Sequence, residues 1–349
     1  MTGFKKVILI FLALAISACN FPELAPIPVA ALPDAVKTPG AKLVLAASDL
    51  TPSATPFQPL PPTPVFTPTE IPTLTPIPTP TSTPFVLPSE IADQVYAKSP
   101  DQMIILLLGS DKRPWDTGFR TDTIVLLVLN PKQGTASLLS FPRDLWVDIP
   151  GVGQERINTA FYNGGFKTLA ATLEHNFGVR PDSYLLINFR SFKQIVDSLG
   201  GLDVRVGQPV KDRYPGKGWI TIPKGENHMN ADMVLWYARS RKTTNDFARN
   251  RRQQEVLLAL YEKMFSLEAV KKAPDIFNKY RKSVITNLEV ADLLPLIPLA
   301  IQVMDTSRIK RYYIEPQNVW DWITPGGAMV LLPKEDEIRN LVRKALKGK

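Results

Sequence analysis

The chain has 349 residues, a formal net charge of +8 and a single cysteine. One cysteine excludes an intramolecular disulfide. The two histidines, His175 and His228, lie far apart without a metal-ligand spacing, which argues against a zinc site. Ser110 and Ser140 have no histidine in a recognisable arrangement, which argues against a serine hydrolase. The basic balance favours anionic partners such as acidic lipids, glycopolymers and phosphates.

The N-terminus has the pattern of an export signal. Two lysines precede an apolar run at 7–16 that is too short to span a membrane comfortably. The run ends in Ile16-Ser17-Ala18-Cys19, which resembles the lipobox of bacterial lipoprotein signal peptides. We therefore predict a signal peptide over 1–18 and lipidation of Cys19. The alternative is a buried free cysteine after an ordinary signal peptide.

The next segment, 19–88, is rich in Pro and Thr, and the stretch TPTEIPTLTPIPTPTSTP is typical of it. Such a composition cannot bury a core and favours extended, polyproline-like conformations. We interpret it as an extracytoplasmic linker, or stalk, that holds one large domain over 89–349 away from the membrane. Plain disorder is the alternative interpretation of the same residues.

The remaining residues predict a layered α/β domain, because strand and helix patterns alternate along it. Apolar runs predict strands at 103–109, 123–130, 135–141, 146–149, 183–189, 202–206, 308–314 and 328–333. Helical spacing predicts helices at 166–178, 191–201 and 247–265, with a charged helix at the C-terminus. Pro131-Lys132-Gln133-Gly134 indicates a hairpin, which favours a mixed sheet over a purely parallel one.

The start of the helix at 247–265 is unusually basic. Asp246 is a plausible N-cap, and Arg249 falls in the first turn, where the helix dipole disfavours a cation. An anion bound at the helix terminus would explain Arg249 and Arg252, which lie near one face. Arg251 should project away from that face as a solvated charge.

Polar residues also follow the early strands, where sites in layered α/β domains are usually found. Asp111 and Asp122 flank two neighbouring strands and could share a hard cation such as Mg²⁺. Arg143 could join the arginines of the basic helix around the same phosphates. Taken singly, each aspartate suits a turn cap or surface ion pair, and each arginine a solvated position.

Several segments occur in an order that closely resembles the LytR-CpsA-Psr family, also called the cell envelope-related transcriptional attenuator domain. They are GSDKR, RTDTIVLLVLNP, LLSFPRDLWVDIPG, RINTAFYNGG, INFRSFKQIVDSLGGLDV and YARSR followed by DFARNRRQQ. The resemblance covers about 102–264, and the remainder would extend the same domain. The chain departs from the family pattern at two places. Ala248 stands where the family's DFGR-like motif often has Gly, and the family's LNG-like motif reads Met229-Asn230-Ala231.

The resemblance implies a three-layer α-β-α sandwich that binds polyprenyl pyrophosphate lipids. It implies an enzyme that moves a glycopolymer from a polyprenyl-pyrophosphate carrier to peptidoglycan, with Mg²⁺ or Mn²⁺ as cofactor. Carried over residue by residue, the metal ligands are Asp111 and Asp122. The pyrophosphate would be held by Arg143, Arg241, Arg249, Arg252 and Gln253.

Such a phosphoryl transfer needs alignment and charge neutralisation more than covalent catalysis. The acceptor hydroxyl would attack phosphorus beside Arg143, and a carboxylate would take its proton. Asp122 and Asp144 are both candidates for that base, and the sequence does not choose between them.

Two other functions compete with the transferase. A pyrophosphatase for the same lipid would use water as its acceptor, and a protein that only binds the lipid would have no acceptor. A DNA-binding regulator suits the basic charge. The predicted export argues against nucleic acid as a partner and places the protein on the extracytoplasmic face of the cell membrane through its lipid anchor.

Overall fold

The computed structural model describes residues 96–111, 119–241, 243–266 and 284–348. The predicted signal peptide, Cys19, the linker and the predicted domain start at Ser89 lie outside the described residues. Within the described part of the chain, no helix is long and apolar enough to cross a membrane.

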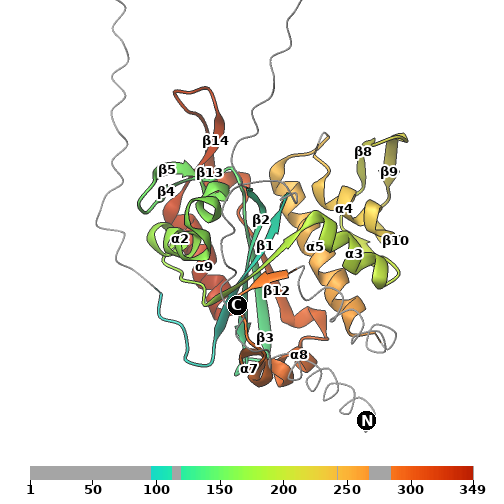
Figure 1. Ribbon diagram of the computed structural model, residues 1–349, viewed down its shortest axis with the longest axis horizontal. Coiled ribbons are helices and arrows are strands. Elements are labelled where there is room, and N and C mark those ends of the chain that lie inside the picture. The colour runs from blue at the N-terminus through green and yellow to red at the C-terminus, as the bar shows by residue number, and fades with distance from the viewer. Residues whose placement is uncertain (1–95, 112–118, 242, 267–283, 349) are drawn as a thin grey trace, which may run out of the picture. The chain divides into compact units, whose positions relative to one another are not determined.

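A six-stranded mixed sheet forms the centre of the domain (Figure 1), in the order β11-β6-β1-β2-β3-β12. Strand β1 is antiparallel to β2 and parallel to β6, and β3 is antiparallel to β2 and parallel to β12. The strands are β1 (Met103–Ser110), β2 (Thr121–Asn130), β3 (Thr135–Phe141), β6 (Ser183–Asn188), β11 (Val284–Thr286) and β12 (Ile309–Tyr313). The predicted mixed sheet and its hairpin are confirmed.

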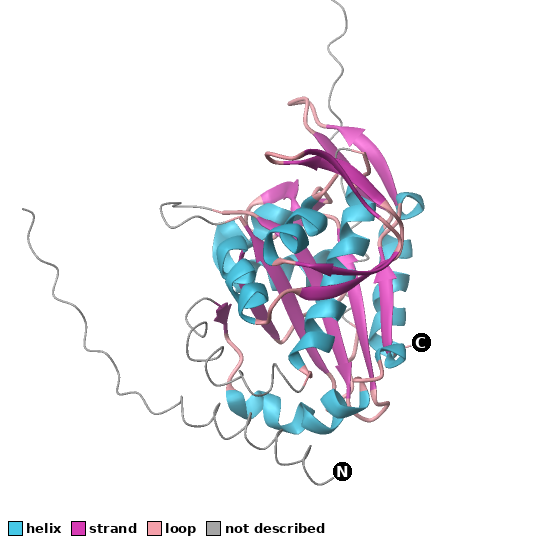
Figure 2. Ribbon diagram, turned by 90° about the vertical axis from the view of Figure 1, so that its right-hand side faces the viewer, coloured by secondary structure: helices cyan, strands magenta, loops and turns pink. Residues whose placement is uncertain are grey.

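Helices cover both faces of this sheet, so the predicted three-layer sandwich is confirmed (Figures 1 and 2). Along β1, Leu106 and Leu108 pack toward α2 and α9, whereas Leu107 faces the opposite layer. Because both faces are covered, β1 and β2 are almost continuously apolar. The two layers are α2 (Ala160–Phe177) with α9 (Glu335–Lys347), and α3 (Phe189–Ser198) with α4 (Ala231–Arg239) and α5 (Asp246–Met264).

Glycines set two of the helix boundaries. Helix α2 is broken at Gly164–Gly165, and Gly178 ends it in the left-handed conformation with φ 71°, as the sequence predicted. After α3, Gly201 has φ 93°, and a Cβ there would lie 2.7 Å from the carbonyl oxygen of Met229. The chain can therefore turn tightly from α3 into β7 only because this residue lacks a side chain.

Four two-stranded ribbons surround the central sheet, pairing β4 with β5, β13 with β14, β7 with β10 and β8 with β9. The sequence predicted no element between 207 and 245, where the structure has β8, β9, β10 and α4. Their bounds are β4 (Trp146–Ile149), β5 (Gly153–Arg156), β7 (Leu202–Val206), β8 (Val210–Tyr214), β9 (Gly218–Ile222), β10 (Gly225–Met229), β13 (Val319–Ile323) and β14 (Met329–Pro333); two short helices, α7 (Val290–Leu293) and α8 (Ile297–Gln302), follow β11.

Candidate functional site

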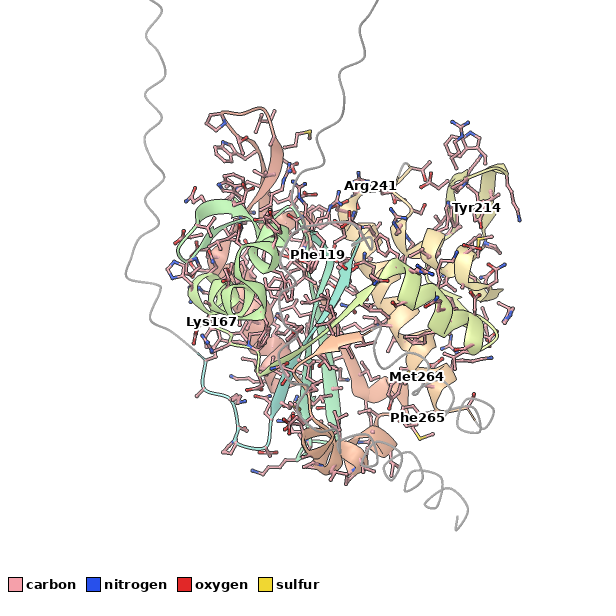
Figure 3. The ribbon with its side chains drawn as sticks, in the orientation of Figure 1. Phe119, Lys167, Tyr214, Arg241, Met264 and Phe265 are labelled. Atoms are coloured by element: carbon pink, nitrogen blue, oxygen red, sulfur yellow. The ribbon has the colours of Figure 1, made fainter. Side chains whose placement is uncertain are left out.

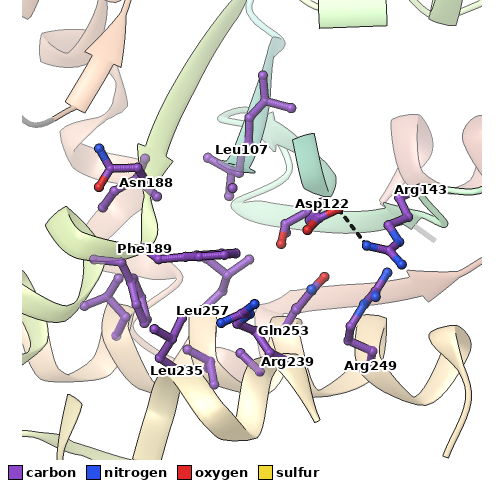
Figure 4. Close-up of a pocket in the computed structure, with 18 of the residues that line it drawn as sticks. Leu107, Asp122, Arg143, Asn188, Phe189, Leu235, Arg239, Arg249, Gln253 and Leu257 are labelled. Carbon is purple, nitrogen blue, oxygen red and sulfur yellow. Dashed lines mark hydrogen bonds and ion pairs between the residues drawn. The ribbon is translucent and has the colours of Figure 1, made fainter. Parts of the chain in front are cut away.

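A cavity of about 260 Å³ lies between the central sheet and the layer of α3, α4 and α5 (Figure 4). Most of its wall is apolar, because side chains on one face of β1 and β6 meet those of the three helices that cover this face. The apolar lining is Leu107, Leu108, Leu185, Ile187, Phe189, Phe192, Leu235, Ala238, Val256, Leu257 and Leu260. A slot of this kind suits an unbranched or isoprenoid hydrocarbon.

The cavity is polar at one end only. Its charged lining groups are Asp122, Arg143, Arg239, Arg241 and Arg249. Along α5 the lining changes from Arg249 through Gln253 to Leu260, so polarity falls from the N-terminal to the C-terminal half of the helix. Arg241 and Met264 accordingly lie at opposite ends of this layer (Figure 3). The site is therefore amphipathic, with an arginine-rich end and an apolar end.

A β-bulge directs Asp122 into the polar end. In the β1–β2 pair, Gly109 is opposite Thr123 but Ser110 is opposite Thr121, so Asp122 is the extra residue. A bulge re-aims the side chain that it carries. A Cβ on Gly109 would lie 3.0 Å from the Thr123 side chain, so glycine keeps the strands close at this point.

Arg143, which follows β3, is the centre of the ion-pair network at this end. Its Nη1 donates to Asp122 Oδ1 at 2.8 Å, while its Nε lies 3.4 Å from Asp144 Oδ2 and 3.6 Å from Asp246 Oδ2. Burial lowers the pKa of Arg143, but the Asp122 bond and the charges of Asp144 and Asp246 outweigh burial, so its pKa is raised overall. The network fixes the guanidinium against one side of the cavity mouth.

Asp246 belongs to the charged network of the site, a role that its sequence pattern does not predict. The N-cap of α5 is Asn245, whose side-chain oxygen accepts from the amide of Ala248 at 2.9 Å, so the predicted Asp246 cap is wrong. Asp246 instead lies in the first turn, where its charge complements the helix dipole. It is 2.9 Å from Arg249 Nη2 and 3.7 Å from Arg241 Nη1, in addition to its Arg143 contact. One carboxylate thus gathers three arginines.

Arg249 is buried to 4% exposure and lines the cavity. Burial lowers its pKa, and only part of that effect is offset by Asp246. Its Nε has no hydrogen-bond partner in the described residues. A buried, incompletely paired guanidinium costs free energy unless a ligand supplies the missing acceptor. An arginine in the first turn of α5 is therefore suited to pair with an anion at the cavity mouth.

The loop that carries Arg241 is held from two sides. The buried Asp212 accepts from the Arg241 amide at 2.9 Å and from the Ser240 hydroxyl. Arg252 donates to the carbonyl oxygens of Tyr237 (3.1 Å) and Ser240, and to the Thr244 hydroxyl at 3.1 Å. Arg252 is not among the described residues that line the cavity. It orders the loop, whereas Arg241 faces the cavity.

Arg251 differs from its predicted role as a solvated charge. Its side chain is 50% exposed, but it pairs with Glu315 and lies over the ring of Tyr313, 5.1 Å from the ring centroid. It projects away from the cavity, as expected, and joins α5 to the segment after β12.

Asp144 lies behind Arg143 and outside the cavity lining. It forms ion pairs with Arg143 on one side and with Arg156, whose Nε lies 3.3 Å from Asp144 Oδ1, on the other. Burial, and then the hydrogen bond and charge of Asp246, raise the pKa of Asp144 above its usual 3.8. We interpret it as a residue that positions Arg143.

The raised pKa of Asp144 predicts a pH dependence of stability. The folded protein binds this proton more tightly than the unfolded chain, so stability falls as pH rises from the unfolded pKa through the raised folded one. Urea unfolding of the parent and Asp144→Asn between about pH 4 and pH 6 tests this. Relative to the variant, the parent should lose free energy of unfolding across this range. A constant difference would contradict the assignment.

The two predicted metal ligands lie at neighbouring strand ends. Asp111 is exposed directly after β1, next to Ser110, which pairs with Thr121 beside Asp122. Among the residues that the structure describes, no three His, Cys, Asp or Glu side chains gather into a metal cage. Asp122 lines the cavity and Asp111 is exposed at the adjacent strand end. Two carboxylates are a donor set that suits Mg²⁺, which commonly completes its shell with phosphate oxygens and water.

A family model described as the LytR_cpsA_psr family matches residues 85–346. The polyisoprenyl-teichoic acid–peptidoglycan teichoic acid transferase TagT of Bacillus subtilis is 31% identical over 231 residues, 63% of this chain and 71% of TagT. The corresponding TagU of Bacillus anthracis is 34% identical over 203 residues, 57% of this chain and 64% of TagU. Regulatory protein MsrR of Staphylococcus aureus is 34% identical over 194 residues, 55% of this chain and 58% of MsrR.

Solved structures agree with the fold. Bacillus subtilis TagV has a TM-score of 0.57 at 28% identity, covering 70% of this chain and 97% of TagV. Bacillus subtilis TagU has a TM-score of 0.54 at 26% identity, covering 71% and 96%. A structure of TagT bound to LIIa-WTA has a TM-score of 0.56 at 24% identity, covering 73% and 94%, and supports the fold alone.

Proposed function

The chain belongs to the LytR-CpsA-Psr family, and from that premise we propose that it transfers a glycopolymer from a polyprenyl-pyrophosphate carrier to cell-wall peptidoglycan. The observation that carries this proposal is the amphipathic cavity, in which an apolar slot opens onto Arg143, Arg241 and Arg249. Relatives named as teichoic acid transferases support the reaction class. The identity of the glycopolymer is left open.

The cavity fits the two parts of such a carrier. The isoprenoid tail would lie between β1, β6 and α5, in contact with Leu107, Leu185 and Leu257. The pyrophosphate would lie at the mouth, where Arg143, Arg241 and Arg249 converge. Guanidinium groups bind phosphate oxygens in charge-assisted, often bidentate hydrogen bonds. The ligand would supply the acceptor that Arg249 Nε lacks.

The reaction is an attack of an acceptor sugar hydroxyl on the phosphorus that bears the glycan. A new P–O bond joins the acceptor to that phosphorus, and the bond to the carrier's phosphate breaks, so polyprenyl phosphate leaves. The arginines hold both phosphates and neutralise the charge that builds up during transfer. Asp122, which lines the cavity, would accept the hydroxyl proton, while Asp144 acts through Arg143. A cation held by Asp111 and Asp122 would add further charge neutralisation at the phosphates.

The metal assignment gives a direct binding test. Titration of Mg²⁺ or Mn²⁺ by calorimetry, with a pyrophosphate present, should show binding to the parent. Asp111→Asn and Asp122→Asn should each lose most of it, because a neutral amide is a much weaker ligand for a hard cation. An aspartate outside the site, Asp197→Asn, serves as the control. Metal affinities equal to that of the parent in both test variants would refute the assignment.

We also propose that the protein is held at the extracytoplasmic face of the cell membrane by a lipid on Cys19, which places it beside its carrier. The motif Ile16-Ser17-Ala18-Cys19 supports this. Cys19→Ala should shift the protein from the membrane to the soluble fraction, because a short apolar run alone anchors weakly. A mature N-terminus that starts elsewhere would exclude the lipoprotein.

Analysis of the products separates transfer from the alternatives. A polyprenyl-pyrophosphate glycan is incubated with the protein, with and without peptidoglycan, and the products are identified by mass spectrometry. Transfer predicts a phosphodiester-linked glycan on peptidoglycan together with polyprenyl phosphate. Free glycan phosphate in both samples would identify a pyrophosphatase, and unchanged lipid a binding protein. One relative is named as a regulatory protein, MsrR. If this chain were a regulator, it would bind nucleic acid and form no product.

A further inference from the structure

An aromatic surface that the proposed cavity does not use lies on two neighbouring ribbons, β13–β14 and β4–β5 (Figure 1). On β13, Trp320 is 58% exposed and Trp322 36% exposed. Single exposed apolar side chains are ordinary, but a group of large ones on one face usually marks a binding surface. We call the group formed by Trp146, Trp320 and Trp322 the aromatic surface; Ile323 and Met329, which pair with each other, point to the other face of the ribbon.

The rings of this surface are held in defined positions. Trp320 and Trp322 are two residues apart on β13, so both point to one face of the ribbon. Trp322 packs edge-on against Trp146, with centroids 5.9 Å apart. The Lys334 ammonium lies 5.0 Å from the centroid of the Trp320 ring. An exposed indole that is fixed in this way loses little entropy when a ligand stacks on it.

Direct contacts join the aromatic surface to the reactive end of the cavity. The amide of Leu331 in β14 donates to the carbonyl oxygen of Asp144 at 3.0 Å. Arg156 donates to the carbonyl oxygen of Met329 at 2.9 Å and pairs with the Asp144 carboxylate, which in turn holds Arg143. A ligand on this surface would therefore lie beside the phosphates bound by Arg143.

The direction of the cavity separates this surface from a membrane contact. The apolar part of the slot extends along α5 toward Leu260, away from the end that holds Arg143 and the β13–β14 ribbon. Arg241 and this ribbon lie at one end of the molecule, and Met264 at the other (Figures 1 and 3). A carrier tail in this slot would run away from the aromatic surface. The surface therefore lies at the end of the domain opposite the one toward which the tail extends.

We propose that the aromatic surface binds the acceptor, a polysaccharide strand of the cell wall, and presents one of its hydroxyl groups to the phosphates; this rests on the proposed transferase function. Sugar rings carry C–H groups on their faces, and these pack against the negative faces of indole rings. Gln154, which accepts from Trp146 Nε1 at 3.2 Å, and Lys334 add polar groups that can pair with hydroxyl and amide substituents.

The test measures binding of soluble, peptide-free glycan strands from purified peptidoglycan to the mature chain, without any carrier lipid. Trp320→Ala should bind these strands roughly tenfold more weakly, the loss expected for one stacked aromatic contact. Trp320→Phe should bind nearly as the parent does, because it keeps a ring. Trp219→Ala is the matched control, since Trp219 is 59% exposed on the separate β8–β9 ribbon. It should leave strand binding unchanged.

Two further measurements make the result specific. Affinity for a polyprenyl pyrophosphate should be equal in the parent and all three variants, and KM for the acceptor should rise in Trp320→Ala with little change in kcat. Equal strand binding by the parent and Trp320→Ala would overturn the proposal. So would a loss of binding to anionic phospholipid vesicles without a loss of strand binding, which would indicate a membrane contact.

Failure of the transferase itself has a different signature. If the parent only hydrolyses the carrier in the presence of strands, the transfer reaction is wrong. The strand-binding comparison contains no carrier and is not affected by that result. If the parent transfers glycan but Trp320→Ala binds strands normally, the transferase proposal stands and the proposal of an acceptor surface is wrong.

Discussion

Replacement of Arg249 by Met is expected to weaken binding of a polyprenyl pyrophosphate by roughly ten- to a hundredfold, the loss of about 1.5–3 kcal/mol for one charge-assisted contact. The same change should leave the free energy of unfolding unchanged or raise it. This combination would identify a residue that is retained for binding at a cost in stability.

The opposite signs follow from the surroundings of Arg249. In the ligand-free protein its guanidinium is buried, its Nε is unpaired, and the charges of Arg143 and Arg241 oppose its own. Asp246 retains its contacts with both of those arginines when Arg249 is lost. A methionine of similar length fills the space without a desolvation penalty, and such replacements of buried ions are often neutral or stabilising. With the pyrophosphate bound, the same cation gains its missing partner.

Arg251→Met supplies the matched control two positions away. It removes the Glu315 pair and the contact with Tyr313 on the far side of α5, so it should cost up to about 1 kcal/mol of stability. Lipid binding should not change. Isothermal titration with a short-chain polyprenyl pyrophosphate and urea unfolding measure both effects. If Arg249→Met and Arg251→Met bind the lipid alike, the basic face of α5 has no role in the site.

The sequence predicted those parts of the fold and site that depend on local pattern. The alternation of apolar runs and helical spacing is sufficient for β1, β2, β3, β6 and β12 of the central sheet, for Gly178 as a helix stop, and for the hairpin after β2. The arginines at 143, 241 and 249 were grouped from their motifs, and the structure places all three around one cavity. A pattern that one segment carries by itself can be recognised in that segment.

Asp246 and Arg252 show what such patterns leave undetermined. Both Asn245 and Asp246 are good N-cap residues, and only the backbone geometry places the cap at Asn245 and frees Asp246 for three arginines. The sequence predicts that Arg252 supports the pyrophosphate site from one turn beyond Arg249. In the structure it donates to carbonyl groups at the end of α4, a packing partner more than ten residues earlier that helical spacing cannot reveal.

The ribbons are predicted only in part, since the apolar runs predict β4, β7 and β14 but not β5, β8, β9, β10 or β13. Strands β8 to β10 are short and exposed on alternate residues, with turns whose glycines take positive φ, so their apolar signal is weak. The link from Asp144 through Arg156 to Met329 joins segments almost the whole domain apart. No local rule connects β4 with the C-terminal ribbon, and only the structure shows the contacts between that ribbon, Arg156 and Asp144.

Replacement of Arg143 by Lys should reduce transfer, measured as kcat/KM for the carrier lipid, by about a hundredfold or more, although the charge is kept. Arg143 contacts Asp122 through Nη1, and Asp144 and Asp246 through Nε. One ammonium group cannot span these three carboxylates, because it lacks the planar fork of the guanidinium. Asp122 would then face the phosphates without its partner, whereas Asp246 would keep Arg241 and Arg249. Arg180→Lys, an exposed arginine paired with Glu174, is the matched control and should retain full activity.

A double-mutant cycle separates neutralisation of Asp122 from direct contact with phosphate. If neutralisation dominates, Arg143→Lys should weaken lipid binding much less in an Asp122→Asn background than in the parent, because the exposed negative charge is then absent. Contacts within one ion-pair network typically couple by about 0.5–3 kcal/mol, up to roughly a hundredfold in affinity. Additive effects would instead show that Arg143 acts on the phosphates independently of Asp122. Binding is the readout, since Asp122→Asn alone is expected to abolish most of the transfer.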